Sequence, residues 1–582
     1  MKKLSAVALA AGILTASCSG HGGQSSLPSA PGSSPAHRSS TIALAPAGWA
    51  STATQGIVVR NAADTGALSP AQKLTVRVGL ALHNSEHLAQ MIAQRQIVSP
   101  GQFMAQYAPT AAEVNAVTSY LRSQGLTNIQ TEPNNLLVSA EGTSGQVNAA
   151  FNTSLESFSL NGSSVFANTK PALVPQSLSG IVVAVLGLNN AVKFAPNPVM
   201  GACKGTTPPA GVPCIRRMDA HQMQTFYNAG NTPTGAQTTI AVMAEGDVTS
   251  TVADLRTAEV RQGLPIVPTT IRTVGYQTGE RNPVALEEWA MDTQASTGIA
   301  GTVAHLYVYA ATALVDSDIT LEYNKWVTDN VAKLGNSSFG GCEYSNYLDG
   351  SMRIIDNILM QGAAQGQTMF ASSGDTGSAC NVLPLNAVDD TGPQMVEFPA
   401  ASPWVVAVGG STLTTNVDST YMGEAAWNGS GGGLSQFENS TSWEQTQQPT
   451  GVGLAAANLR GVPDIAMAAD PTAGDYNVYE SKSCPNYCGI GGTSEAAPLA
   501  MGVYARLQSA HNNALGFAAP RFYNVYNTNT AGAVVTGPPP TQMDGGFHDL
   551  LTGNNTLYSA TPGYDYVSGL GTMDITEMNR TI

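Results

Sequence analysis

The sequence predicts an α/β protein with a largely parallel sheet, preceded by a smaller α+β domain. With 582 residues the chain is too long for one ordinary core. Beyond about residue 215, short apolar strands alternate with helical segments, which is typical of a doubly wound, mostly parallel sheet covered by helices on both faces. The clearest strands are Thr239–Met243, His305–Ala310, Thr368–Ser372 and Trp404–Val408.

The N-terminal residues have the pattern of an export signal. Residues 1–18 have a basic start, an apolar run and small residues before Cys18, as signal peptides do. Thr15-Ala16-Ser17-Cys18 resembles a bacterial lipoprotein processing site, so lipid attachment at Cys18 and plain signal cleavage are both open. No later stretch is long and apolar enough to span a bilayer. We therefore expect a secreted protein, anchored to the cell envelope if Cys18 is lipidated.

Three segments precede the large domain. Residues 19–73 begin rich in Ser, Gly, Pro and Ala and are predicted to be a flexible spacer. Residues 74–188 form the α+β domain, and residues 189–214 form a proline-rich linker suited to a processing cut. Within the small domain we expect helices around Ser85–Gln94 and Thr110–Gln124 and strands near Asn135–Ala140 and Val182–Gly187.

Net charge and cysteine content indicate which partners and cross-links to expect. A net charge of −15 argues against a nucleic-acid partner, because few cations are available to neutralise phosphates. Setting Cys18 aside leaves six of the seven cysteines, an even number that suits disulfides in an exported protein. Proximity favours Cys203 with Cys214, Cys484 with Cys488 and Cys342 with Cys380, although other pairings and a metal site at Cys484 and Cys488 stay open.

A candidate nucleophile is Ser494, in the run Gly491-Gly492-Thr493-Ser494-Glu495-Ala496-Ala497-Pro498. A Gly-Thr-Ser turn that opens a helix places the hydroxyl where backbone N–H groups stabilise negative charge. A bare Thr-Ser pair would more often be a helix N-cap. The glycines before and Ala-Ala-Pro after resemble the nucleophile turn shared by subtilisins and sedolisins.

The general base is not a histidine. Subtilisins draw it from a His-Gly-Thr-His stretch, and no histidine here has those neighbours. Glu288 and Asp292, four residues apart in a helical stretch, instead place two carboxyls on one helix face. Together with Ser494 this resembles the sedolisin (serine-carboxyl peptidase) family, and the resemblance implies a subtilisin-like fold with Glu288 as base and Asp292 as its partner.

The same resemblance assigns Asp375, after the strand ending at Ser372, to the oxyanion hole. A carboxyl donates a hydrogen bond to an oxyanion only when protonated, so the site is expected to work in acid. Asn336–Glu343 resembles the substrate-pairing strand, implying substrate contacts at Ser338, Gly340 and Gly341; Gly341 stands where the family often has Trp.

Two further segments resemble the family. The C-terminal run resembles its calcium loop and implies one calcium ion, with hard oxygen ligands from Asp549, Leu550, Thr561, Gly563 and Asp565. Residues 74–188 resemble a kumamolisin-type activation domain, which implies a folding aid and intramolecular inhibitor. Residues 215–582 are then the peptidase domain.

The prediction is a secreted, acid-acting serine endopeptidase that hydrolyses polypeptides through an acyl-enzyme and is made as a self-activating zymogen, with a monomer expected. The alternatives are a tripeptidyl exopeptidase on the same scaffold and a non-catalytic binding protein.

Overall fold

The computed structural model describes residues 45–196, 199–200, 217–275, 286–380, 394–446, 458–529, 534–535 and 539–582. Residues 45–582 form one compact unit. The predicted signal peptide, Cys18, Cys203 and Cys214 lie outside the described residues. In the described part of the chain, no helix combines the length and the apolar character needed to cross a membrane.

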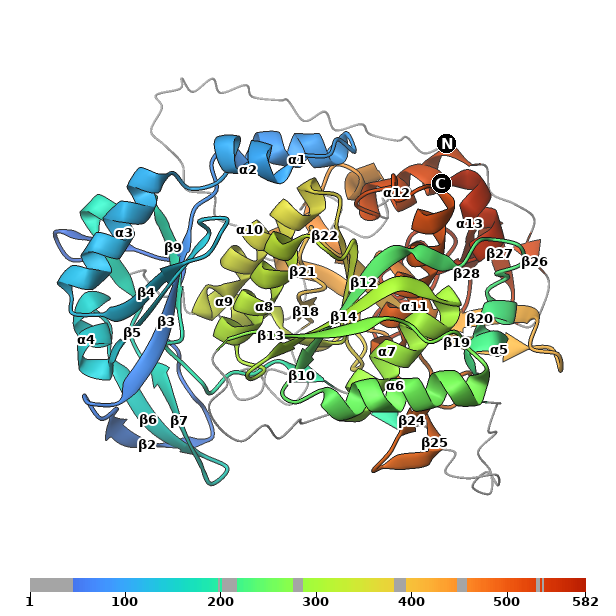
Figure 1. Cartoon of the computed structure of the whole chain (residues 1–582), viewed down its shortest axis with the longest axis horizontal. Helices are drawn as coiled ribbons and strands as arrows, with labels where there is room; N and C mark the ends of the chain where they lie inside the picture. Colours follow the sequence, from blue (N-terminus) through green and yellow to red (C-terminus); the bar gives the residue numbers. More distant parts are fainter. Residues whose placement is uncertain are drawn as a thin grey trace, which may run out of the picture. The chain divides into compact units, whose positions relative to one another are not determined.

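A 12-stranded mixed sheet organises the large domain (Figure 1). Its parallel part runs in the order β13 (Thr269–Thr273), β14 (Val303–Ala311), β12 (Gly235–Glu245), β15 (Leu334–Ser337), β17 (Thr368–Ser372), β19 (Val406–Thr415), β23 (Ile465–Ala468) and β29 (Thr572–Met573). The antiparallel strands are β28 (Phe547–Leu550), β27 (Thr541–Asp544), β26 (Val534–Val535) and, beside β19, β20 (Tyr421–Ala426). The predicted doubly wound sheet is confirmed, although the strand expected at Trp404 begins at Val406.

The chain first adds β13 and β14 on one side of β12 and then adds β15, β17, β19 and β23 in order on the other side. With right-handed crossovers, this reversal places helices on opposite faces of the sheet. One group comprises α5 (Ala220–Phe226), α6 (Thr249–Gln262), α7 (Leu286–Ala300) and α11 (Thr493–Ala510). The other comprises α8 (Asp316–Asp329), α9 (Glu343–Asp349) and α10 (Ser351–Ala364), while α12 (Ala519–Thr528) and α13 (Ile575–Thr581) lie near the C-terminus. Helices α7 and α11, which carry the candidate catalytic residues, pack directly against each other.

The small domain has an antiparallel sheet in the order β4 (Thr127–Thr131), β5 (Leu137–Thr143), β3 (Lys73–Leu80) and β9 (Val182–Leu186). Its helices are α1 (Ser85–Ala93), α2 (Pro100–Gln106), α3 (Ala111–Ser123) and α4 (Ser144–Ala150). The two expected helices are present as α1 and α3. Capping boxes at Ser99, Thr110 and Thr143 begin α2, α3 and α4, and apolar periodicity predicts neither α2 nor α4.

The predicted flexible spacer is too long. Residues from 45 onwards belong to the folded unit, in which β1 (Trp49–Ser51) pairs with β8 (Leu173–Pro175). Strand β2 (Ala62–Ala67) joins β6 (Leu155–Leu160) and β7 (Ser163–Asn168) in a second small sheet. Ile57 is fully buried and Val59 nearly so. These residues are ordered because they pair with strands that are distant in sequence, and local composition does not predict such pairing.

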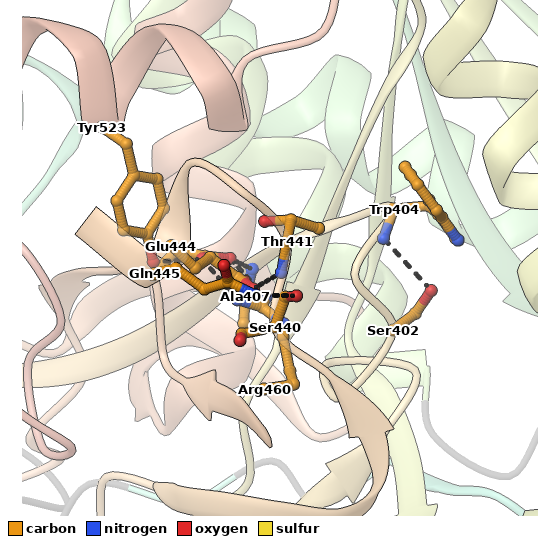
Figure 2. A network of polar contacts seen from close by, with 10 residues as sticks. Ser402, Trp404, Ala407, Ser440, Thr441, Glu444, Gln445, Arg460 and Tyr523 are labelled. Atoms are coloured by element: carbon orange, nitrogen blue, oxygen red, sulfur yellow. Dashed lines mark hydrogen bonds and ion pairs between the residues drawn. The ribbon is translucent and has the colours of Figure 1, made fainter. Parts of the chain in front are cut away.

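A buried ion network fixes the segment between β22 (Leu459–Val462) and β23 (Figure 2). The Arg460 guanidinium binds both Asp464 oxygens at 2.7 Å and also pairs with Glu444. Tyr523 of α12 donates to Asp464 at 2.8 Å, and the backbone N–H of Ala407 donates to the same carboxylate at 2.7 Å. Since all three charged groups are buried, removing one would leave its partners' charge uncompensated.

Disulfides join Cys342 to Cys380 and Cys484 to Cys488. The second lies in the hairpin of β24 (Tyr476–Glu480) and β25 (Cys484–Gly491), which leads into α11. The proposed metal alternative at Cys484 and Cys488 is therefore wrong.

Candidate active site

Ser494 occupies the first turn of α11, immediately after β25. Gly492, the residue before this helix, has a φ of 100°, a conformation that favours glycine. A Cβ there would also come within 2.7 Å of an Asp375 oxygen. The Ser494 side chain is buried, and its hydroxyl donates to the backbone carbonyl of Ser338 at 3.3 Å.

Glu288 and Asp292 lie one turn apart on α7, and both are completely buried. Ser338 holds Asp292 in place: its hydroxyl is 2.6 Å from the Asp292 Oδ1 atom and 3.2 Å from the backbone carbonyl of Ser494. Asn336 in turn donates to the Ser338 hydroxyl at 3.0 Å. One serine thus links the acidic pair to the nucleophile's backbone.

Burial raises the pKa of both carboxyls well above their usual range, and the Asp292 charge raises that of Glu288 further. Ser494 lies close enough to lower the Glu288 pKa somewhat, although its hydroxyl donates to the Ser338 backbone carbonyl. Within the described residues, neither Glu288 oxygen nor the Asp292 Oδ2 atom has a hydrogen-bond partner. Such a pair retains protons that isolated carboxyls would release, and it titrates as one unit.

Asp375 follows β17 and reaches the same turn. Its Oδ1 atom accepts hydrogen bonds from the Thr493 backbone N–H at 2.6 Å and the Thr493 hydroxyl at 2.9 Å. Burial raises the Asp375 pKa to about 6, against the opposing effect of the two Thr493 hydrogen bonds. The carboxyl is therefore protonated in mild acid and can then donate a hydrogen bond beside Ser494.

The predicted substrate strand is β16 (Phe339–Cys342), and the chain's own linker pairs with it. In β10 (Ala195–Pro196), Ala195 lies opposite Gly340 and Pro196 opposite Phe339. Strand β11 (Val199–Met200) pairs on the other side with β25, Val199 opposite Gly491. The linker is thus antiparallel to the strands on both sides of Ser494.

The predicted calcium residues are also brought together. Asp549 accepts from the Gly563 N–H at 2.8 Å, and Asp565 accepts from the Thr561 N–H at 3.0 Å. The Asp549 Oδ1 atom is buried without a partner among the described residues. Leu550 follows Asp549 at the end of β28 and is fully buried. Two neighbouring carboxylates, one with an unused oxygen, and nearby backbone carbonyls fit a hard cation, although no group of three acidic, histidine or cysteine side chains forms a site in the described chain.

Sequence reasoning missed two of the contacts. Ser338 was expected beside substrate, but its hydroxyl holds Asp292, and Thr493 was seen only as part of a turn although it fixes Asp375. Neither role leaves a local signal, since both depend on residues more than 40 positions away. Gly340 and Gly341 lie in β16 as predicted, where the linker covers Gly340.

Comparisons with known proteins agree with this geometry. Residues 60–191 match the Pro-kumamolisin activation domain, and residues 288–546 match the subtilase family. Sedolisin of Pseudomonas sp. (strain 101) is 35% identical over 574 residues, which cover 92% of each chain. Xanthomonalisin of Xanthomonas sp. (strain T-22) is 34% identical over 570 residues, covering 88% of this chain and 66% of that protein. The solved Pseudomonas sedolisin complexed with two molecules of pseudo-iodotyrostatin aligns with a TM-score of 0.55 at 33% identity, over 63% of this chain and 98% of that chain.

Proposed function

Because the chain belongs to the sedolisin family of serine-type peptidases, we propose that it is an acid-acting endopeptidase that activates itself from a zymogen. The observation that carries this proposal is the antiparallel linker, which places polypeptide on both sides of Ser494. Secretion is part of the proposal and depends on the N-terminal signal sequence alone.

In the proposed reaction, the Ser494 Oγ atom attacks the peptide carbonyl and its proton passes to Glu288. Before the attack, Asp292 and Glu288 share one proton, so the pair carries one negative charge and one carboxylate is available as base; the proton from Ser494 then makes the pair neutral. Protonated Asp375 donates a hydrogen bond to the developing oxyanion. The amine leaves with a proton from Glu288, and water then hydrolyses the acyl-enzyme by the reverse proton path.

The linker suggests where activation occurs. The described strands end at Pro196 on one side of Ser494 and resume at Val199 on the other. We therefore place the cut among the bonds from Pro196 to Val199. Asn197 and Pro198 lie outside the described residues.

The same arrangement favours an endopeptidase over a tripeptidyl exopeptidase. Upstream of β10, the Phe194 ring packs edge-on against Phe339 at 5.9 Å, and the Phe194 N–H donates to the Leu314 carbonyl at 2.8 Å. A substrate chain that followed the path of the linker would continue beyond β16 on its amino-terminal side, whereas an exopeptidase would need a closed end there, and this supports the endopeptidase. The long folded segment before the linker already occupies that path.

Asp549, Asp565 and the carbonyls of Leu550, Thr561 and Gly563 would hold the proposed calcium ion. The ion would neutralise the two carboxylates and join the end of β28 to the loop that follows it. Its contribution is structural, and no catalytic step involves it.

The test uses the full chain without its signal sequence, beside Ser494→Ala, in buffer containing calcium. After a shift to about pH 4, wild type should cut its linker between residues 196 and 199 at a rate independent of protein concentration. It should then cleave an internally cleavable peptide with a blocked amino terminus. A stable, uncut and inactive wild type would favour the binding-protein alternative, whereas cleavage of free-amino peptides alone would favour the exopeptidase.

A further inference from the structure

One carboxyl beside the cleft has no part in the proposed reaction. Glu397 lies in β18 (Glu397–Phe398), which pairs with the predicted substrate strand β16 through Cys342 and Gly341. Strand β16 thus lies between β18 and the linker strand β10. Glu397 therefore lies on the strand that borders the predicted substrate strand on the side opposite the linker.

Two glycines leave room for this carboxyl. A Cβ atom at Gly374 would lie 2.7 Å from the Glu397 carboxyl carbon, and one at Gly340 would lie 3.0 Å from its Oε2 atom. Gly374 directly precedes the proposed oxyanion residue Asp375, and Gly340 is the position that pairs with the linker. The Glu397 carboxyl is thus placed between the substrate strand and the oxyanion residue.

In the part of the chain that the structure describes, the Glu397 carboxyl has no side-chain hydrogen bond and no ion pair. Burial, reinforced by the charge of Asp375, raises its pKa to about 8. Among the described residues, no cation opposes this rise in the Glu397 pKa. A partly buried carboxyl without a partner gains most from a donor that a ligand brings.

We propose that Glu397 is the specificity-determining residue for the substrate side chain at the attacked carbonyl, and that it selects arginine or lysine there. The inference rests on the proposed peptidase function. The attacked carbonyl must point at Asp375, so the side chain on the same residue lies next to Gly374 and Gly340, where the Glu397 carboxyl is found. A bound guanidinium stabilises the ionised carboxyl and displaces its proton.

The linker itself does not contradict this selection. Residues 194–200 contain no lysine or arginine. A tethered segment has a high effective concentration at the site, so cleavage in cis proceeds without the affinity that a favoured side chain adds. Selection by Glu397 therefore concerns substrates supplied in trans.

The test compares two amino-blocked peptides that differ only at the residue that carries the attacked carbonyl. One has arginine there, and the other has norleucine, whose side chain is aliphatic and uncharged. Activated wild type should cleave the arginine peptide with a kcat/KM at least about tenfold higher. Glu397→Gln should lose about tenfold of this ratio, and Glu397→Arg should prefer a glutamate peptide. Glu577→Gln, at an exposed carboxylate paired with Arg580, is the matched control and should keep the ratio.

A wild-type ratio near one overturns the inference even if no variant folds. So does a ratio that stays unchanged in both Glu397 variants. If activated wild type cuts neither peptide nor a denatured protein, the proposed peptidase function fails, and the inference fails with it. Cleavage of both peptides at equal rates leaves the peptidase function intact and removes only the role of Glu397.

Discussion

The Asp375 carboxyl is fastened to Thr493, the residue immediately before the candidate nucleophile, by both the backbone N–H at 2.6 Å and the hydroxyl at 2.9 Å. This contact sets the distance between the proposed oxyanion donor and Ser494. Hydrogen bonds to a carboxylate lower its pKa, so Thr493 also influences the pH at which Asp375 can act as a donor.

The pH dependence of activity should follow Asp375. Donation requires the protonated carboxyl, so kcat/KM should fall as pH rises through about 6. Thr493→Val removes one hydrogen bond that lowers the Asp375 pKa, so the fall should move to higher pH. Asp375→Asn keeps a donor that does not titrate, so the fall near this pH should disappear. A pH–rate series with one peptide measures all three proteins, and an unchanged profile in Asp375→Asn would rule out the proposed role.

The base should be Glu288 and not its neighbour. Glu288→Gln should lower kcat/KM by about 10⁴-fold, because the amide cannot accept the Ser494 proton. Glu287→Gln is the matched control: Glu287 binds the Ser483 hydroxyl at 2.5 Å and should lose no more than a few-fold. Equal losses in the two variants would show that helix α7, and not a specific base, had been disturbed. Peptide cleavage after activation in trans by wild type gives the rates.

Ser338 should act by positioning Asp292. Ser338→Ala removes a hydrogen bond to a buried carboxyl, so kcat should fall by about 10- to 100-fold with little change in KM. The adjacent Ser337→Ala is the control, because the Ser337 hydroxyl contacts Tyr323 at 2.7 Å and not the acidic pair. A Ser338→Ala enzyme that lost affinity but kept kcat would indicate direct substrate binding. Steady-state kinetics at one acidic pH separates the two outcomes.

Calcium should stabilise the folded protein. Ser494→Ala, which cannot digest itself, should lose several degrees of Tm when a chelator is added, since a ligand at about 100 times its Kd contributes about 2.7 kcal/mol. In Asp549→Asn the chelator effect should be smaller or absent. Asp544→Asn, another buried carboxylate nearby, should respond as the parent does. No effect of calcium or chelator on Tm in the parent would argue against the ion.

The fold should be most stable in acid. Burial raises the pKa of Glu424 and of Glu343 from 4.5 to about 7. The folded state therefore binds more protons than the unfolded state, so stability is fully present below about pH 4.5 and is lost as pH rises through about 7. Each group contributes roughly 3 kcal/mol.

Thermal unfolding of Ser494→Ala between about pH 4 and 8 should accordingly show Tm decreasing with pH. Glu424→Gln should show a shallower decrease of Tm with pH, because the variant lacks one of the groups that bind a proton more tightly in the folded state. A Tm that rises across this range would contradict the predicted proton uptake. The same measurement on Glu577→Gln, whose carboxylate is exposed and ion-paired, provides the control slope.

Much of the catalytic assignment could be made from sequence because its signals are local. The Gly-Gly-Thr-Ser turn and the four-residue spacing of Glu288 and Asp292 each specify geometry within one helix turn. Alternating strands and helices likewise predicted the sheet. The short helix α4 was missed because only a cap at Thr143 marks its start.

Local sequence signals specify the reactive groups, their geometry within a helix turn and the class of sheet that carries them. The contacts of Ser338 with Asp292, of Thr493 with Asp375 and of the linker with β16 and β25 form only on folding. Folding alone also places Glu397 between Gly340 and Gly374. The difference lies in sequence separation. Helix turns and caps depend on neighbours a few residues apart, whereas these contacts join segments that meet only when the sheet assembles.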